Sequence, residues 1–136
     1  MEMAIEVQAL HHVGFSVPKH QVAALQAFYR QVFGLEADPS RWHIPGVPGC
    51  FLDFPNATQL HIMGKDGVSP YAQGEGQDPV SNHVALTVAS LERAAAELKE
   101  RGIAFFSQRN VAADRLEQLF VRDPAGNLLE LRQDAG

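Results

Sequence analysis

The sequence predicts an α+β fold of two tandem βαβββ modules whose strands form a curved mixed sheet, and two internal repeats support this prediction. The first repeat relates residues 12–17, HVGFSV, to residues 83–88, HVALTV. In both stretches, apolar residues alternate with a leading histidine and small residues, which is the pattern of a half-buried strand. A strand face made of one histidine and small residues leaves room for a ligand and fills a hydrophobic core poorly.

The second repeat relates residues 51–62 to residues 120–131 without gaps. The phenylalanines that open the two segments, the prolines within them, and the pair His61 and Glu130 all keep the same offset. A repeat of about 70 residues that occurs twice indicates two modules rather than a solenoid. Each module therefore begins on a strand with an inward histidine and ends on a strand with an inward histidine or glutamate.

The first module continues from its opening strand into a helix. Pro18 is suited to a helix start, and Gly34 can supply a left-handed cap at the other end. Apolar residues lie at helical spacing between them, and we expect Phe28 and Tyr29 in this stripe to pack in the core. A loop and two strands follow, at residues 41–49, 50–54 and 58–63. A further strand before these two is the least certain element of the module.

The second module repeats this order with clearer signals. Ser90 is the expected N-cap of its helix, and Gly102 is expected to end that helix. Three strands should follow, near residues 103–107, 119–122 and 127–132. We expect one domain over residues 1–136, with modules at about 8–63 and 82–133 joined by a glycine- and proline-rich linker at 64–81.

Composition excludes several classes of function. With 46% hydrophobic and 20% charged residues, the chain is of the ordinary soluble globular class. A net charge of −5 argues against a nucleic-acid or anionic-membrane partner, because both require a basic surface. The single cysteine, Cys50, excludes an intramolecular disulfide and is expected to be a small buried hydrophobe. No apolar run reaches the length of a membrane span, so a cytoplasmic location is expected.

Four side chains that can bind a metal occupy equivalent positions of the repeat. The two-residue period of a strand places His12, His61, His83 and Glu130 on the face opposite the helices. If the sheet curls, these side chains converge, and three imidazoles with one carboxylate suit a divalent first-row metal such as Fe, Mn, Co, Ni or Zn. The remaining histidines lack such a placement and are interpreted as structural; they are His11, His20 and His43.

The same residues resemble the vicinal oxygen chelate superfamily, which includes glyoxalase I, extradiol dioxygenases, methylmalonyl-CoA epimerase, and fosfomycin- and bleomycin-resistance proteins. The resemblance covers essentially the whole chain and rests on the two histidine-led strands and on the closing motif DPAGNLLEL at residues 123–131. It implies paired βαβββ modules that form a cup around a metal, commonly in a homodimer. His12, His83 and Glu130 match the ligand positions of the family, whereas glyoxalase I typically has Glu, and the epimerase Gln, where this chain has His61.

The resemblance implies a metal-dependent lyase or isomerase of glyoxalase I type. Its small substrate would chelate the metal through adjacent oxygens, while Glu130 or His61 moves a proton. The alternatives are an extradiol-type dioxygenase that uses Fe(II), and a binding protein of the bleomycin-resistance kind. Side chains that could hold an anionic group or line the pocket of such a site are Arg41, Trp42, Arg109 and Arg115.

Overall fold

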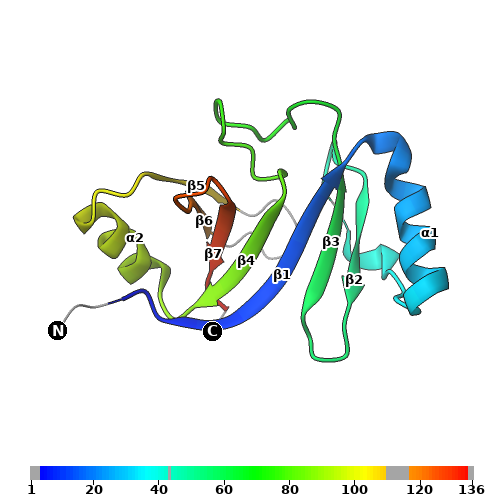
Figure 1. Cartoon of the computed structure of the whole chain (residues 1–136), viewed down its shortest axis with the longest axis horizontal. Coiled ribbons are helices and arrows are strands. Elements are labelled where there is room, and N and C mark those ends of the chain that lie inside the picture. The colour runs from blue at the N-terminus through cyan, green and yellow to red at the C-terminus, as the bar shows by residue number, and fades with distance from the viewer. Residues whose placement is uncertain (1–3, 43, 110–116, 135–136) are drawn as a thin grey trace.

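The computed structural model describes residues 4–42, 44–109 and 117–134, within which seven strands form one sheet in the order β2-β3-β1-β4-β7-β6-β5. Figure 1 shows that α1 and α2 lie at opposite ends of this curled sheet, with the long strand β1, drawn in blue, crossing between them. The sheet is mixed, because β1 pairs with β3 and β4 pairs with β7 in parallel, while the other pairs are antiparallel. The predicted fold class is confirmed.

The first module has one regular strand fewer than predicted. Its elements in the described residues are β1 (Val7–Val17), a 3-10 turn (Lys19–Gln21), α1 (Val22–Phe33), a second 3-10 turn (Pro39–Arg41), β2 (Gly49–Asp53) and β3 (Gln59–Gly64). An isolated bridge between Ala37 and Leu52 stands where the uncertain strand was expected. Gly34 caps α1 as predicted, with φ of 70°, which glycine adopts without strain.

The second module has the complete βαβββ order. Its elements are β4 (His83–Val88), α2 (Leu91–Glu100), β5 (Phe105–Arg109), β6 (Glu117–Arg122) and β7 (Leu128–Arg132). Ser90 is the N-cap of α2, and its hydroxyl accepts a hydrogen bond from the backbone N–H of Arg93, as the sequence predicts. Within the described ranges, no helix is long and apolar enough to cross a membrane.

The closing hairpins of the two modules are built alike. The backbone N–H of Phe54 donates to the carbonyl of Thr58 at 2.8 Å, and that of Asp123 donates to Asn127 at 3.0 Å. These are equivalent positions of the repeat. In the second hairpin, the Asp123 side chain also accepts from the backbone of Ala125 and Asn127, which closes the turn locally. The repeated sequence therefore forms the same turn twice, and each turn leads into the strand that ends its module.

Each helix covers one half of the same sheet face. The core beneath α1 contains Cys50, Leu52, Leu60 and Ile62, and the core beneath α2 contains Val88, Ala94, Leu98, Leu119, Val121 and Leu131. Cys50 is buried and Tyr29 packs on the first core, as expected. Phe28 was predicted to be buried but is 49% exposed, because it lies on the outer side of α1. Most aliphatic side chains lie on the helix face, whereas the opposite face carries the histidines and Glu130 together with buried Phe51, Met63 and Phe120.

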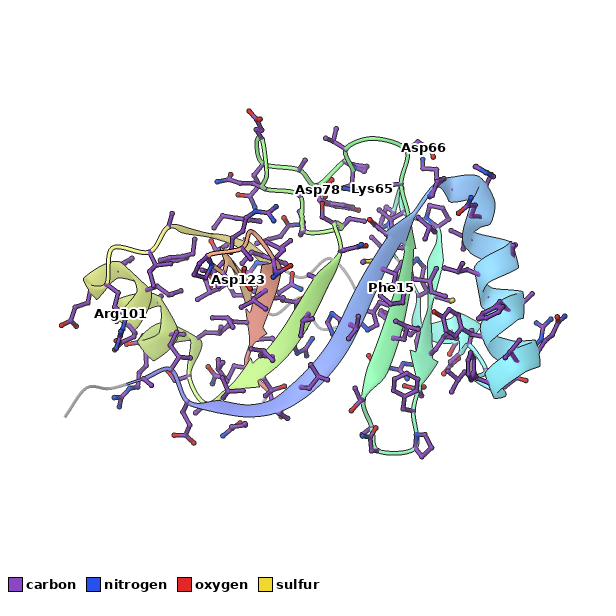
Figure 2. The ribbon with its side chains drawn as sticks, in the orientation of Figure 1. Phe15, Lys65, Asp66, Asp78, Arg101 and Asp123 are labelled. Atoms are coloured by element: carbon purple, nitrogen blue, oxygen red, sulfur yellow. The ribbon has the colours of Figure 1, made fainter. Side chains whose placement is uncertain are left out.

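The segment between β3 and β4 is held in place by hydrogen bonds to one buried carboxylate. Asp78 accepts hydrogen bonds from the backbone N–H of Ser69 at 2.7 Å, from the Ser69 hydroxyl at 2.6 Å and from Lys65 Nζ at 2.9 Å. Figure 2 labels Lys65 and Asp78 close together beyond the ends of the strands. Burial raises the pKa of Asp78, but the hydrogen bonds from Ser69 and Lys65 outweigh burial and hold that pKa below its usual value.

We expect Asp78→Ala to lower the free energy of unfolding by about 3 kcal/mol, because it leaves Lys65 and the backbone of Ser69 without their buried acceptor. The exposed Asp66 accepts a single backbone hydrogen bond, so Asp66→Ala should cost about 1 kcal/mol or less. Urea unfolding measures both values. Because the folded pKa of Asp78 is depressed, the difference from wild type should be complete at pH 7 and shrink below about pH 4. Equal losses in the two variants would contradict this account.

Candidate metal centre

One small residue on β4 brings two of the predicted ligands together. Ala85 is paired with His12 on β1 and with Glu130 on β7. All three residues point to the face that the helices leave free, and Ala85 is fully buried. Because the side chain between them is only a methyl group, the longer side chains of the two flanking strands can lean toward each other above it.

A second small residue, on β1, repeats this arrangement. Gly14 is paired with His61 on β3 and with His83 on β4. A Cβ atom placed on Gly14 would lie 2.6 Å from Cε1 of His83 and 2.7 Å from Cε of Met63, which is closer than real contacts allow. The imidazole of His83 therefore occupies the space above Gly14. The small residues of the repeated strands, which the sequence indicated, provide room for the histidine rings.

Three of the four predicted ligands converge. The ligand atoms of His12, His83 and Glu130 lie within 4.8 Å of one another, and all three side chains are buried. Nε2 of His12 lies 3.1 Å from Nε2 of His83, and these two atoms lie 3.4 Å and 3.3 Å from Oε1 of Glu130. All three residues come from one chain. Two imidazole nitrogens and one carboxylate oxygen that face a common point form a donor set suited to a divalent first-row metal.

Each of these three side chains also has a hydrogen-bond partner on the side that faces away from the common point. Nδ1–H of His83 donates to the carbonyl of Ser81 at 2.7 Å, so the neutral ring carries its lone pair on Nε2, the nitrogen that would bind a metal. Oε2 of Glu130 accepts from Nε2 of Gln118 at 3.0 Å, so Oε1 is the oxygen that faces the histidines. Nδ1 of His12 lies 2.7 Å from Nδ1 of His11. Outer partners of this kind are typical of metal sites, so the residues present fit a divalent metal.

The protonation of the three side chains reflects their mutual contact. Burial raises the pKa of Glu130, but hydrogen bonds from His12 and His83 outweigh it, so the net pKa is well below the usual value and the carboxylate is charged. Burial lowers the pKa of His83, but Glu130 and the carbonyl of Ser81 raise it to a net value above the ordinary one. For His12, burial outweighs the attraction of Glu130 and the net pKa is lowered. The charged carboxylate thus favours the protonated form of His83, and a metal bound at the same point would take the place of that proton.

His61 lies beside this group and not in it. Its ring stacks on that of His12 with centroids 3.7 Å apart and an angle of 19° between the rings. Nε2 of His61 lies 2.9 Å from Oε1 of Gln59, whose Nε2 donates to Oδ1 of Asp53 at 3.0 Å. Because Asp53 can only accept, the amide oxygen of Gln59 must face His61, which places the hydrogen on Nε2 and leaves a lone pair on Nδ1. Burial, then the charge of His12, lowers the pKa of His61 well below its usual value, so the ring is neutral.

The other side chains named from the sequence have mixed placements. Arg41 donates to both carboxylate oxygens of Asp53, at 2.6 Å and 2.8 Å, so its charge is already paired. Trp42 lies beside His61, with its ring edge-on to the imidazole and the centroids 6.5 Å apart. Arg109 ends β5, an edge strand of the sheet. His20 is exposed in the first 3-10 turn. Two further candidates, His43 and Arg115, lie outside the described residues.

Sequence reasoning missed two residues of the centre, His11 and Gln118. His11 was interpreted as structural, because a residue next to His12 should point to the opposite face of a regular strand. Burial and the charge of Arg132 lower the pKa of His11 to about 4, so its ring is neutral at pH 7. Gln118 lies on β6 opposite β7, in a register that becomes known only once the strands are paired. Neither residue belongs to the repeated motifs, so the sequence contained no signal for them.

We expect Gly14→Ala to weaken metal binding by roughly 10–100-fold, the range seen when a ligand loses its correct orientation. The added methyl group must displace the ring of His83, and overpacking should also cost about 1–3 kcal/mol of unfolding free energy. Gly74→Ala is the matched control, because the nearest atom to its Cβ, Oε1 of Gln77, is at 3.5 Å, an ordinary contact. Competition with a chromophoric chelator measures the affinity. A Gly14→Ala protein that binds metal as tightly as wild type would contradict the geometry.

A family model described as Glyoxalase/Bleomycin resistance protein/Dioxygenase superfamily matches residues 11–119. No curated protein sequence matches the chain significantly.

Solved structures of several enzymes share the fold. Methylmalonyl-CoA epimerase from Mycobacterium tuberculosis is 20% identical, with a TM-score of 0.68 over 100% of this chain and 94% of that one. The Streptomyces coelicolor methylmalonyl-CoA epimerase in complex with 2-nitronate-propionyl-CoA is 18% identical, with a TM-score of 0.63 over 98% and 100%. Homoprotocatechuate 2,3-dioxygenase from Brevibacterium fuscum is 16% identical, with a TM-score of 0.67 over 98% of this chain and 34% of that one. At these identities, the likeness concerns the fold alone.

Proposed function

The chain belongs to the glyoxalase/bleomycin resistance protein/dioxygenase superfamily, and we propose that it is a metal-dependent isomerase or lyase of glyoxalase type. Its substrate is a small molecule with two adjacent oxygens. The observation that supports this proposal most strongly is the convergence of His12, His83 and Glu130 within 4.8 Å, each with an outer hydrogen-bond partner. A protein that only sequesters an organic ligand has no need of such a donor set.

The proposed ligands are Nε2 of His12, Nε2 of His83 and Oε1 of Glu130. A divalent ion held there would act as a Lewis acid toward the substrate oxygens. His61, which the sequence suggested as a fourth ligand, is proposed instead as the group that moves the proton. Both oxygens of Glu130 are engaged, one toward the histidines and one by Gln118, which makes Glu130 less available as a base.

His61 is suited to accept a proton for three reasons. Its ring is neutral, and Gln59 holds the hydrogen on Nε2, so a lone pair is on Nδ1; burial makes the ring a weaker base than a free imidazole, and the nearby charge of Glu130 partly offsets this by raising its pKa. The stacking contact with His12 keeps the ring next to the proposed ligands. Trp42 and Phe51 flank the same ring and exclude water from that side. The residue is thereby positioned to take a proton from the carbon next to a substrate carbonyl and to return it.

The test begins with the metal content of protein purified without chelator. Wild type should contain about one divalent ion per chain and His83→Ala far less, and equal, near-zero contents would exclude the proposed site. The loaded wild type is then incubated in D₂O with methylmalonyl-CoA, the compound bound in one structural neighbour, and with hemithioacetals of 2-oxoaldehydes. Deuterium incorporation next to the carbonyl, followed by NMR, is the expected result.

The same protein distinguishes the second candidate function, an extradiol-type dioxygenase. Two histidines and one carboxylate also describe the ligand set of non-haem Fe(II) oxygenases, so this donor set favours that reading as well. Oxygen uptake with a catechol, without deuterium exchange on the carbonyl compounds, would favour the dioxygenase. Tight binding of a flat ligand by a metal-free chain without turnover would instead favour a binding protein of the bleomycin-resistance kind.

We also propose that the chain forms a homodimer. The superfamily resemblance implies this assembly, and α1 exposes three large apolar side chains, those of Phe28, Val32 and Phe33. Clusters of exposed apolar residues mark interaction surfaces more often than isolated ones do. Light scattering on the purified chain measures the mass, and a monomer at micromolar concentration would contradict the proposal.

A further inference from the structure

An irregularity in β1 lies directly next to the first proposed ligand. Along the antiparallel pairing with β4, Leu10 is opposite Leu86, and His12 is opposite Ala85. Two steps on β1 therefore match one step on β4, so His11 is the extra residue of a β-bulge. In a regular strand, the side chains of two successive residues point to opposite faces of the sheet, and a bulge relaxes that rule at one position.

The bulge brings the side chain of His11 against that of His12. Their Nδ1 atoms lie 2.7 Å apart, within hydrogen-bond distance, and the two rings meet edge to face at 76° with centroids 5.0 Å apart. One nitrogen must donate and the other must accept, because two lone pairs at that distance repel each other. Nε2 of His12 faces His83 and Glu130, at 3.1 Å and 3.4 Å. If this Nε2 binds a metal, the hydrogen of His12 is on Nδ1 and His11 is the acceptor.

We propose that His11 is a positioning residue of the metal centre, which accepts the Nδ1 hydrogen of His12 and so fixes the tautomer and the ring orientation of that ligand. This inference rests on the proposed function, since it assumes a metal at the centre. His11 then does for His12 what the carbonyl of Ser81 does for His83. The two ligand histidines differ in one respect: the partner of His83 is a backbone atom, whereas that of His12 is a side chain. A mutation can therefore remove the acceptor of His12 without touching the backbone.

The test compares two substitutions at His11 by competition with a chromophoric chelator, using Zn²⁺ as the probe. His11→Phe keeps a planar ring and removes the acceptor, so it should weaken Zn²⁺ binding by roughly 10–100-fold. His11→Asn can place its Oδ1 near the position of the imidazole Nδ1, so it should bind within about threefold of wild type. His20→Phe, the same change at an exposed histidine, should leave the affinity unaltered. Thermal unfolding of the metal-free proteins shows whether each variant folds.

Each outcome bears on one proposal or both. Wild-type affinity in His11→Phe would overturn the positioning role while leaving the metal centre intact. Equal losses in His11→Phe and His11→Asn would show that the residue is needed for packing and not as an acceptor, which also overturns the inference. Absence of Zn²⁺ binding by wild type would overturn this inference together with the proposed function. The result that supports the role is weak Zn²⁺ binding by His11→Phe together with near-wild-type binding by His11→Asn.

Discussion

Replacing Glu130 with Gln should weaken metal binding more than any other conservative substitution in this chain. The side chain is 2% exposed and its Oε1 faces both ligand histidines, so the amide would fill the same space without the negative charge. An outer partner of a metal site contributes roughly 10–100-fold in affinity, and a direct carboxylate ligand should contribute more than 100-fold. Elemental analysis and chelator competition measure the loss, and turnover should fall with the metal content.

The matched control for Glu130→Gln is Gln118→Ala, which removes only the hydrogen bond to Oε2 of Glu130. We expect this variant to remain within the range of an outer partner, so Glu130→Gln should have the larger effect of the two. Near-wild-type metal binding in Glu130→Gln would show that the carboxylate is not a ligand. In that case, His12 and His83 would have to bind the ion with a different third group, and the proposed centre would be wrong.

Replacing His61 with Ala should separate metal binding from turnover. The ring lies outside the group of proposed ligand atoms and its Nε2 is bonded to Gln59, so we expect the metal content to stay close to that of wild type. Loss of a positioned general base typically costs 10²–10⁴-fold in rate, and deuterium exchange next to the carbonyl should fall by roughly that factor. Removal of a buried ring also leaves a cavity beside Trp42 and Phe51, so urea unfolding must accompany the assay.

Gln59→Ala is the partner experiment for His61→Ala. It keeps the imidazole but removes the acceptor that fixes its tautomer, so the exchange rate should drop by less than in His61→Ala while metal binding is unaltered. If His61→Ala instead loses its metal to the same degree as Glu130→Gln, then His61 is a fourth ligand, as the sequence suggested, and proton transfer must be assigned elsewhere. The two measurements together decide between these roles.

The sequence was sufficient for those features that depend on local pattern. The two-residue period and the repeat predicted the opening strands, the closing hairpins and the shared face of His12, His83 and Glu130, because alternation along a strand is a local property. The caps of both helices followed from Gly34 and Ser90 for the same reason. The prediction was weakest for the additional strand expected before β2 in the first module, because residues 34–48 have no alternating pattern. The structure has one isolated bridge there.

The tertiary structure alone decided which side chains actually meet. All four predicted ligands share a face, but a face does not determine ring orientation. The ring of His61 stacks on His12, and its Nε2 faces Gln59 instead of the point that the other three ligand atoms face. The bulge that turns His11 toward His12 depends on the pairing of β1 with β4, which no local pattern encodes. The assembly of the ligand group within one chain likewise follows from the packing of the two modules against each other. Periodicity along a strand determines the side of the sheet, and only contacts between strands determine the distances within a site.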